Sequence, residues 1–242
     1  MHQGGSFRRH ALNIFVRRLL PNKPLLVAVL RGPFRGARLL LNPRHSLRKI
    51  FGLYEHELNQ WIEQALHLVD KVVDVGANDG YFTFGCAAAF RRLKKPGRII
   101  AFEPQAKHFA QLQMSEKHRQ ERGAANVEIW IEQRFVGNEE FNDNTTLDAV
   151  ANRPIPSIKP RNALVKVDVE GAEIDVIEGA SSWLDHSNLF LIEVHNEAFI
   201  ERIKERFAAR SLHLKLIKQS PLPIIGYEHR QKENCWLVSQ IN

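Results

Sequence analysis

Short apolar runs alternate with amphipathic stretches along most of this 242-residue chain. Helical patterns at 55–68, 83–90 and 198–210 flank or separate the apolar runs. Alternating strands and helices are typical of βαβ units around a parallel sheet. The last two runs, LHLKLIK (212–218) and CWLVSQ (235–240), predict an antiparallel hairpin that closes the sheet. We therefore expect an α/β fold whose parallel strands lie at residues 71–75, 98–103, 126–131, 163–169 and 189–194.

The first fifty residues follow a different pattern. In SFRRHALNIFVRRLL (6–20), apolar residues such as Phe7 and Ile14 share one helical face between arginines, and Pro21 ends the helix. LLVAVL (25–30) and RGARLLLN (35–42) predict a β-hairpin. We expect two units: a basic extension at 1–50, with an amphipathic helix and a hairpin, and a catalytic domain at 51–242.

The distribution of charged residues also changes near residue 50. Residues 1–50 hold eleven Lys and Arg and no acidic residue, whereas the remaining chain has 23 basic and 27 acidic residues. Such asymmetry indicates an anionic partner for the extension, either lipid headgroups, a phosphate-bearing substrate carrier or nucleic acid. A solvated basic helix and a mitochondrial transit peptide are the alternatives. We favour a helix that lies on an anionic membrane surface.

Two cysteines, Cys86 and Cys235, are too few for a disulfide framework, and no cluster of Cys and His surrounds them. They indicate core positions in a reducing compartment. The apolar run at 24–30 is too short to span a bilayer. We expect a cytoplasmic protein that is peripheral to a membrane through residues 1–50.

The segment VVDVGANDG (72–80) carries the strongest chemical signal. Asp74 ends an apolar run, and Gly76 and Gly80 permit a tight turn before the helix. A dinucleotide fingerprint needs G-x-G-x-x-G, but Asn78 fills the middle glycine position here. S-adenosylmethionine (SAM) contains no pyrophosphate, and an acid before the first glycine suits its cationic amino-acid end. A turn without a ligand is the alternative.

Later strands end in further polar residues at the edge where Asp74 lies. Glu103 comes 23 positions after Gly80, close to the spacing at which an acid reaches ribose hydroxyls, and Pro104 stiffens the turn behind it. ALVKVDVEGAE (163–173) and LFLIEVHN (189–196) end the next two strands. They bring four more polar side chains to this edge: Asp168, Glu170, Glu193 and His195.

These motifs together resemble the FkbM-type methyltransferases over about residues 35–240. The resemblance rests on DVGANDG, FEP, TTLDAV (145–150), VKVDVEGAEIDVIEGA (165–180) and LIEVH. It implies a class I, Rossmann-like methyltransferase fold, SAM as donor and most often O-methylation of a sugar, glycolipid or secondary-metabolite hydroxyl. It also implies that Glu103 is the ribose acid, that Asp168 lies at the active-site edge, and that the SAM turn consists of Asp74, Gly76, Ala77, Asn78 and Gly80. Where the family has a small residue near adenine, this chain has EQRFVGN (132–138).

Methyl transfer from a sulfonium is an in-line displacement, so the enzyme's main task is positioning. A hydroxyl nucleophile also gains from a base within hydrogen-bond reach. We predict that Asp168 meets the acceptor oxygen, that His195 is the other candidate base with Glu193 beside it, and that Glu170 contacts the acceptor. No metal is expected. As an alternative, these four side chains gather Mg²⁺ through hard oxygen ligands.

Nucleic acid is a poor candidate acceptor, because the turn VDVEGAE lacks the proline and aromatic ring that stack a flipped base. The second hypothesis is a SAM-fold binding module without catalysis that acts through residues 1–50. Intact acids at Asp74, Glu103 and Asp168 argue against it.

Overall fold

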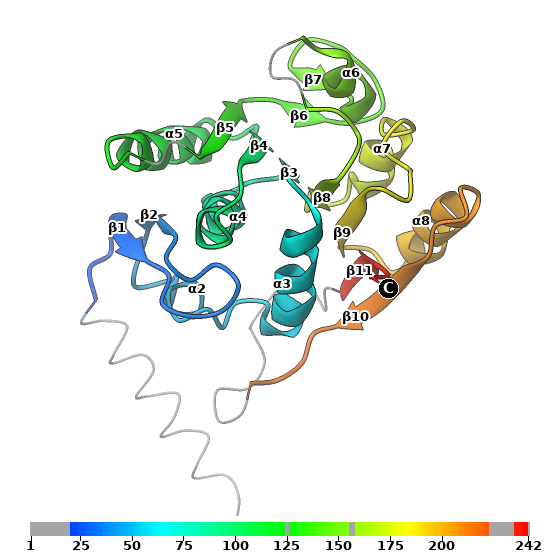
Figure 1. The fold of residues 1–242 in the computed structure, drawn as a ribbon. Coiled ribbons are helices and arrows are strands. Elements are labelled where there is room, and N and C mark those ends of the chain that lie inside the picture. Colours follow the sequence, from blue (N-terminus) through cyan, green and yellow to red (C-terminus); the bar gives the residue numbers. More distant parts are fainter. Residues whose placement is uncertain (1–19, 124–125, 155–157, 223–234, 242) are drawn as a thin grey trace, which may run out of the picture.

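The computed structural model describes residues 20–123, 126–154, 158–222 and 235–241 (Figure 1). The amphipathic helix expected from residue 6 therefore lies outside the described residues, and so does the proposal that it contacts a membrane. Within the described part of the chain, no helix has the length and apolar character needed to cross a membrane.

A seven-stranded sheet with the order β10-β11-β9-β8-β3-β4-β5 forms the centre of the molecule (Figure 1). The five strands from β9 to β5 run parallel, whereas β11 runs antiparallel to both β9 and β10. The expected α/β fold, with a mostly parallel sheet and a C-terminal antiparallel hairpin, is confirmed. The strands are β3 (Lys71–Val75), β4 (Gly97–Phe102), β5 (Val127–Glu132), β8 (Ala163–Val167), β9 (Leu189–Val194), β10 (Leu214–Lys218) and β11 (Cys235–Ser239).

Helices cover both faces of the sheet because successive strand residues point into two separate cores. Val72 and Ile99 pack into one core, with α3, α4 and α5, whereas Val73 and Ile100 pack into the other, with α6, α7 and α8. Both cysteines are buried thiols in these cores, as expected. The helices are α2 (Leu47–Ile50), η1 (His56–Leu58), α3 (Asn59–Leu68), α4 (Tyr81–Arg92), α5 (Ala106–Gln120), α6 (Leu147–Asn152), α7 (Glu173–Glu178) and α8 (Ala198–Ala208).

The predicted N-terminal hairpin is present as β1 (Leu25–Ala28) paired antiparallel with β2 (Arg38–Leu41). It packs against the helical layer beside α4 and α5 (Figure 1). Gln111 Nε2 donates to the carbonyl of Leu40 at 2.5 Å, and the backbone N–H of Leu40 donates to Ser115 Oγ at 3.0 Å. These contacts satisfy backbone groups of β2 that lack a strand partner. The boundary proposed at residue 50 stays a prediction, although residues 25–41 share a core with the sheet.

Some predicted boundaries differ from the structure. β4 ends at Phe102 and β8 ends at Val167, because the parallel pairing with β3 stops opposite Val75. Glu103 and Asp168 therefore lie just beyond their strands. The segment 138–162 contains α6 and also β7 (Asn144–Thr145), which pairs with β6 (Phe135–Val136).

Gly76 controls how closely the ends of β3 and β8 approach. It has a φ of +80°, and a Cβ at this position would overlap with the backbone oxygen of Asp168. In the sequence, this glycine is expected to permit a tight turn that binds SAM. The structure gives a reason within the fold, namely contact between two backbone segments.

We predict that Gly76→Ala destabilises the protein much more than Gly123→Ala. Gly123 has a similar φ of +72°, but a Cβ there meets nothing within 4 Å. Gly123→Ala should lower the free energy of unfolding by about 1–2 kcal/mol, the cost of a left-handed residue. Gly76→Ala adds steric overlap and should cost several kcal/mol more. Urea denaturation measures both, and equal losses would contradict the assigned contact.

Candidate active site

The carboxyl ends of four parallel strands meet at one edge of the sheet (Figure 1). Asp74 is the second-last residue of β3, and Glu103, Asp168 and His195 directly follow β4, β8 and β9. In open α/β sheets, ligands bind outside this edge. The structure thus brings together residues that are up to 121 positions apart in the sequence.

The turn between β3 and α4 is held by backbone hydrogen bonds. The N–H groups of Gly76 and Ala77 both donate to the carbonyl of Phe102 at 3.0 Å, and Gly80 N–H donates to the carbonyl of Ala77 at 2.9 Å. Gly76, Asn78 and Gly80 all have positive φ values. Asn78 tolerates this region better than most residues with a side chain, which explains why it can replace the middle glycine.

Glu103 links this turn to β4. Its Oε2 accepts the N–H of Asn78 at 2.7 Å, and its Oε1 accepts the N–H of Gln105 at 2.9 Å. A carboxylate has about four acceptor positions, and these two N–H groups use two of them. His108 Nδ1 lies 4.0 Å from Oε1, and 6% of the Glu103 side chain is exposed. Pro104 follows, and its carbonyl accepts Gln133 Nε2 at 3.3 Å. The other acceptor positions of the Glu103 carboxylate fit a ligand with two neighbouring hydroxyl groups.

Lys166 is the side chain at the centre of the site, and sequence reasoning missed it. Its Nζ lies 3.2 Å from Asp74 Oδ1 and 3.1 Å from Asp168 Oδ2, and it donates to the carbonyl of Gly76 at 2.9 Å. Burial alone would lower the pKa of Lys166, but Asp168 and Asp74 outweigh burial and raise it. The ammonium group therefore stays charged and joins β3, the turn and β8.

Asp74 is fully buried, and Thr83 Oγ1 donates to its Oδ2 at 2.5 Å. One oxygen of the Asp74 carboxylate therefore contacts Thr83, and the other contacts Lys166. These observed contacts connect β3 to α4 through Thr83 and to β8 through Lys166. Direct contact between Asp74 and the amino-acid end of SAM stays a prediction.

Asp168 is the most exposed carboxylate of the central network, with 26% of its side chain accessible. Burial acts to raise the pKa of Asp168. The nearby charge of Lys166, a hydrogen bond with Glu193 and the nearby charge of His195 outweigh burial and lower this pKa. Asp168 is therefore ionised at neutral pH. It is placed to accept a hydrogen bond from a ligand at the edge of the sheet.

His195 lies beside Asp168, with 3.7 Å between its Nε2 and Asp168 Oδ1. Its Nδ1 lies 2.5 Å from Oε1 of Glu173, whose side chain is fully buried at the start of α7. The hydrogen bond with Glu173 raises the pKa of His195. Burial acts to lower this pKa, and the nearby acids Glu193 and Asp168 raise it further. The Glu173 contact also orients the imidazole so that Nε2 points toward Asp168.

Asp168, Glu193 and His195 offer ligand atoms within 4.8 Å of one another. These are three of the four residues considered for Mg²⁺, whereas Glu170 is exposed and makes no hydrogen bond or ion pair within the described residues. Lys166 already places a cation 3.1 Å from Asp168, which weakens the attraction of this group for a divalent ion. The role of Glu170 in acceptor binding stays a prediction.

Two residues of this site carried a signal that the sequence analysis did not use. Lys166 is a charged residue inside an otherwise apolar strand, and such residues are rarely buried unless paired. Glu173 follows Asp168 by five residues within the motif VDVEGAE. Its partner His195 is 22 residues away, so the pairing is not visible without the fold.

Comparisons with known proteins agree with this fold. The sequence profile described as the methyltransferase FkbM domain matches residues 74–215, more than half of the chain. A search of curated protein sequences found no match. Among solved structures, methyltransferase FkbM from Methylobacillus flagellatus KT is similar, with a TM-score of 0.52 and 18% identity over 70% of this chain. The similar region spans 43% of that structure's chain, so this chain corresponds to less than half of it.

Two further structures have lower scores. Precorrin-6y C5,15-methyltransferase from Geobacter metallireducens GS-15 has a TM-score of 0.48 and 13% identity, over 78% of this chain and 86% of its own. A putative rRNA methylase from Clostridium thermocellum has a TM-score of 0.47 and 14% identity, over 76% of this chain and 94% of its own. These likenesses concern the fold.

We predict that Lys166→Met destabilises the protein and that Asp74→Asn partly reverses the loss. Removing the ammonium group leaves a fully buried carboxylate without its counter-ion, which costs about 3–5 kcal/mol. In the double variant that charge is absent, so the two losses should not add. Urea denaturation of the wild type, both single variants and the double variant measures this coupling. Additive losses would show that the pair is not energetically linked.

Proposed function

This chain belongs to the FkbM methyltransferase family, and on that premise we propose that it transfers the methyl group of SAM to a hydroxyl group. The proposed donor site is the turn at residues 76–80 with Glu103 and Pro104. The proposed acceptor site is the neighbouring edge around Asp168. Members of methyltransferase families generally use SAM, which supplies a methyl group on a cationic sulfur.

Glu103 supports the donor site in two ways. Its hydrogen bonds to Asn78 and Gln105 fix the carboxylate, so little conformational entropy is lost when a ligand binds. Its remaining acceptor positions suit the two ribose hydroxyls of SAM. The positive charge of the sulfonium is also compatible with an edge that carries Glu103, Asp168 and Glu193.

The observation that carries the proposed reaction is the Lys166 bridge between the turn and Asp168. Through the Gly76 carbonyl and the Asp168 carboxylate, one ammonium group links the donor turn to the acceptor edge. An in-line displacement requires the acceptor oxygen, the methyl carbon and the sulfur to be aligned. The Lys166 contacts support such alignment, because they connect the donor turn to the acceptor edge.

Asp168 and His195 take different roles in this proposal. Asp168 is ionised and lies 3.7 Å from His195 Nε2, at the acceptor edge. The acceptor hydroxyl donates its hydrogen bond to Nε2 of the neutral His195 imidazole, which takes the proton as the oxygen attacks the methyl carbon and the bond from that carbon to sulfur breaks. Asp168 and Glu193 then stabilise the resulting imidazolium, and Glu173 holds the ring in place.

A screen of acceptors tests the proposed activity. Transfer of tritium from [methyl-³H]SAM is measured for sugars, glycolipids and hydroxylated secondary metabolites, each beside its analogue with a blocked hydroxyl. The proposal expects labelling of a free hydroxyl and loss of labelling when that hydroxyl is blocked or Asp168 is changed to Asn. Labelling that survives both changes would contradict it. A folded protein that binds SAM and labels nothing would favour the binding-module hypothesis.

The pH profile of kcat/KM should depend on Glu173. Because Glu173 raises the pKa of His195, the neutral base appears only above the ordinary histidine value near 6.5. The rate should therefore rise with pH through a midpoint above that value. Glu173→Gln keeps the hydrogen bond but removes the charge, so the midpoint should move to lower pH.

Glu178→Gln is the matched control, because Glu178 lies on the same helix and is exposed. It should leave the midpoint where it is. If Glu173→Gln also leaves the midpoint unchanged while His195→Ala abolishes turnover, the assigned coupling between Glu173 and His195 is wrong.

A further inference from the structure

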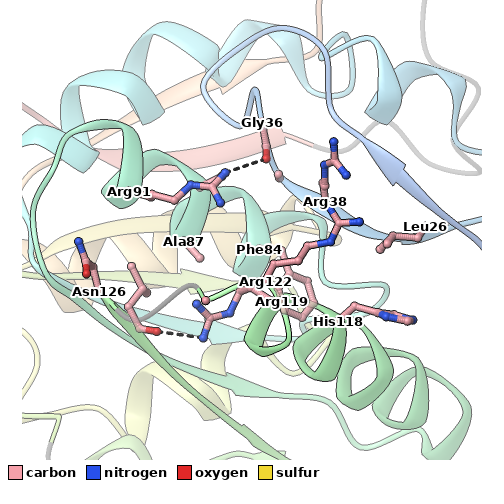
Figure 2. A pocket seen from close by; sticks show the side chains of 14 residues that line it. Leu26, Gly36, Arg38, Phe84, Ala87, Arg91, His118, Arg119, Arg122 and Asn126 are labelled. Atoms are coloured by element: carbon pink, nitrogen blue, oxygen red, sulfur yellow. Dashed lines mark hydrogen bonds between the residues drawn. The ribbon is translucent and has the colours of Figure 1, made fainter.

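A cavity of about 430 Å³ lies at the opposite end of the sheet from the candidate active site. Its walls come from the β1–β2 hairpin, the middle and end of α4, the end of α5 and the start of β5 (Figure 2). Val127, the first residue of β5, lines it. The strand ends that carry Asp74 and Glu103 lie at the other edge.

The lining of this cavity is strongly basic. Among the described residues that line it are four arginines and one histidine, and none of these lining residues is acidic. Figure 2 shows these side chains gathered around the cavity from the hairpin, α4 and α5. They are Arg38, Arg91, His118, Arg119 and Arg122.

Within the described residues, one of the four arginines has its charge balanced by a close ion pair. Arg119 binds both carboxylate oxygens of Glu116, at 2.6 and 2.7 Å. Arg91 donates to the carbonyl of Gly36 at 3.2 Å, which positions the guanidinium without neutralising it. Arg38 and Arg122 are exposed and make no side-chain hydrogen bond or ion pair within the described residues.

Positions at helix ends explain part of this arrangement. Arg91 and Arg119 lie in the last turns of α4 and α5, where a cation interacts favourably with the helix dipole. The helix dipole does not account for Arg38, because this arginine lies on the strand β2. Guanidinium groups stay charged at any physiological pH, so their mutual repulsion around one cavity is relieved when an anion binds between them.

The remaining wall of the cavity is apolar. Phe84, Ala87 and Ala88 from α4 line it together with Leu26 from β1, and the short alanine side chains leave space. The cavity volume falls in the range of small-molecule sites, and it is much larger than an inorganic phosphate requires. The site therefore combines an anion-binding rim with a surface for a hydrocarbon group.

We propose that this cavity binds an organic phosphate, with the phosphoryl group between Arg38, Arg91 and Arg122 and an apolar substituent against Phe84 and Leu26. Arginine binds phosphate oxygens in a bidentate manner. Such a ligand comes either from the headgroup of an anionic lipid or from a soluble phosphate ester. The site is separate from the candidate active site and does not depend on the proposed methyl transfer.

Calorimetry with the full chain tests the proposal, with octyl phosphate as the probe and inorganic phosphate as the comparison. We expect one saturable site for octyl phosphate and weaker binding of inorganic phosphate. Arg38→Gln and Arg122→Gln should each weaken octyl phosphate binding by about tenfold, since each removes charge-assisted hydrogen bonds. Arg210→Gln is the matched control, because Arg210 is an exposed arginine that does not line the cavity.

Several results would overturn the assignment. These are no saturable binding of octyl phosphate by the wild type, equal affinity for octyl and inorganic phosphate, or equal losses in the control and cavity variants. Thermal unfolding of each variant shows whether a loss of binding is a loss of folding. If both single cavity variants unfold, the wild-type comparison of octyl and inorganic phosphate still decides the question.

Vesicle sedimentation identifies the source of the phosphate. If the ligand is a lipid, phosphatidylglycerol vesicles should bind the full chain more strongly than phosphatidylcholine vesicles, and Arg38→Gln with Arg122→Gln should reduce that difference more than Arg210→Gln does. If octyl phosphate binds but the two cavity substitutions leave vesicle binding unchanged, the phosphate is that of a soluble ester. Both results support the assigned chemistry.

Discussion

A buried ammonium group between two carboxylates determines the geometry of this molecule's functional edge. Lys166 and Asp74 are direct partners in the register of β8 and β3, and their charges meet within 3.2 Å. If the two strands paired one residue out of register, the side chains would point to opposite faces and two charges would be buried without partners. The ion pair therefore favours one alignment of the two strands that carry the donor turn and the acceptor edge.

Other parts of the site depend on that alignment. The Asp168 N–H donates to the carbonyl of Val75 at 3.0 Å, and the close passage of Gly76 beneath the Asp168 carbonyl allows no side chain. With β3 and β8 fixed, β9 brings His195 to Asp168, and Glu173 sets the orientation of the imidazole. The chemistry proposed for this edge follows from these backbone positions.

The two ends of the sheet have opposite electrostatic character. Carboxylates dominate the edge that we assign to a cationic donor, whereas arginines surround the cavity at the other edge. Part of the positive charge in residues 1–50 is balanced by the domain, since Arg35 pairs with Glu63 and Lys49 pairs with Asp79. Arg38 has no such ion pair among the residues that the structure describes, and it lines the basic cavity.

Sequence patterns predicted the fold well because strand alternation and the DVGANDG turn are local signals. They also placed Glu103, Asp168 and His195 at one edge, since parallel strands end together. They could not predict the pairing of Lys166 with Asp74, because it depends on the order of strands in the sheet. The basic cavity was missed for a similar reason: its arginines come from separate segments, and only packing of the hairpin on α4 and α5 brings them together.

SAM binding measured by calorimetry tests the central claim most directly. The wild type should bind one equivalent of SAM. Glu103→Gln should weaken that binding by about 10–100-fold, since hydrogen bonds to a charged acceptor are lost. Glu128→Gln, on the exposed start of the neighbouring strand β5, should bind SAM like the wild type. A folded wild-type protein that does not bind SAM, or a folded Glu103→Gln variant with unchanged affinity, would contradict the account.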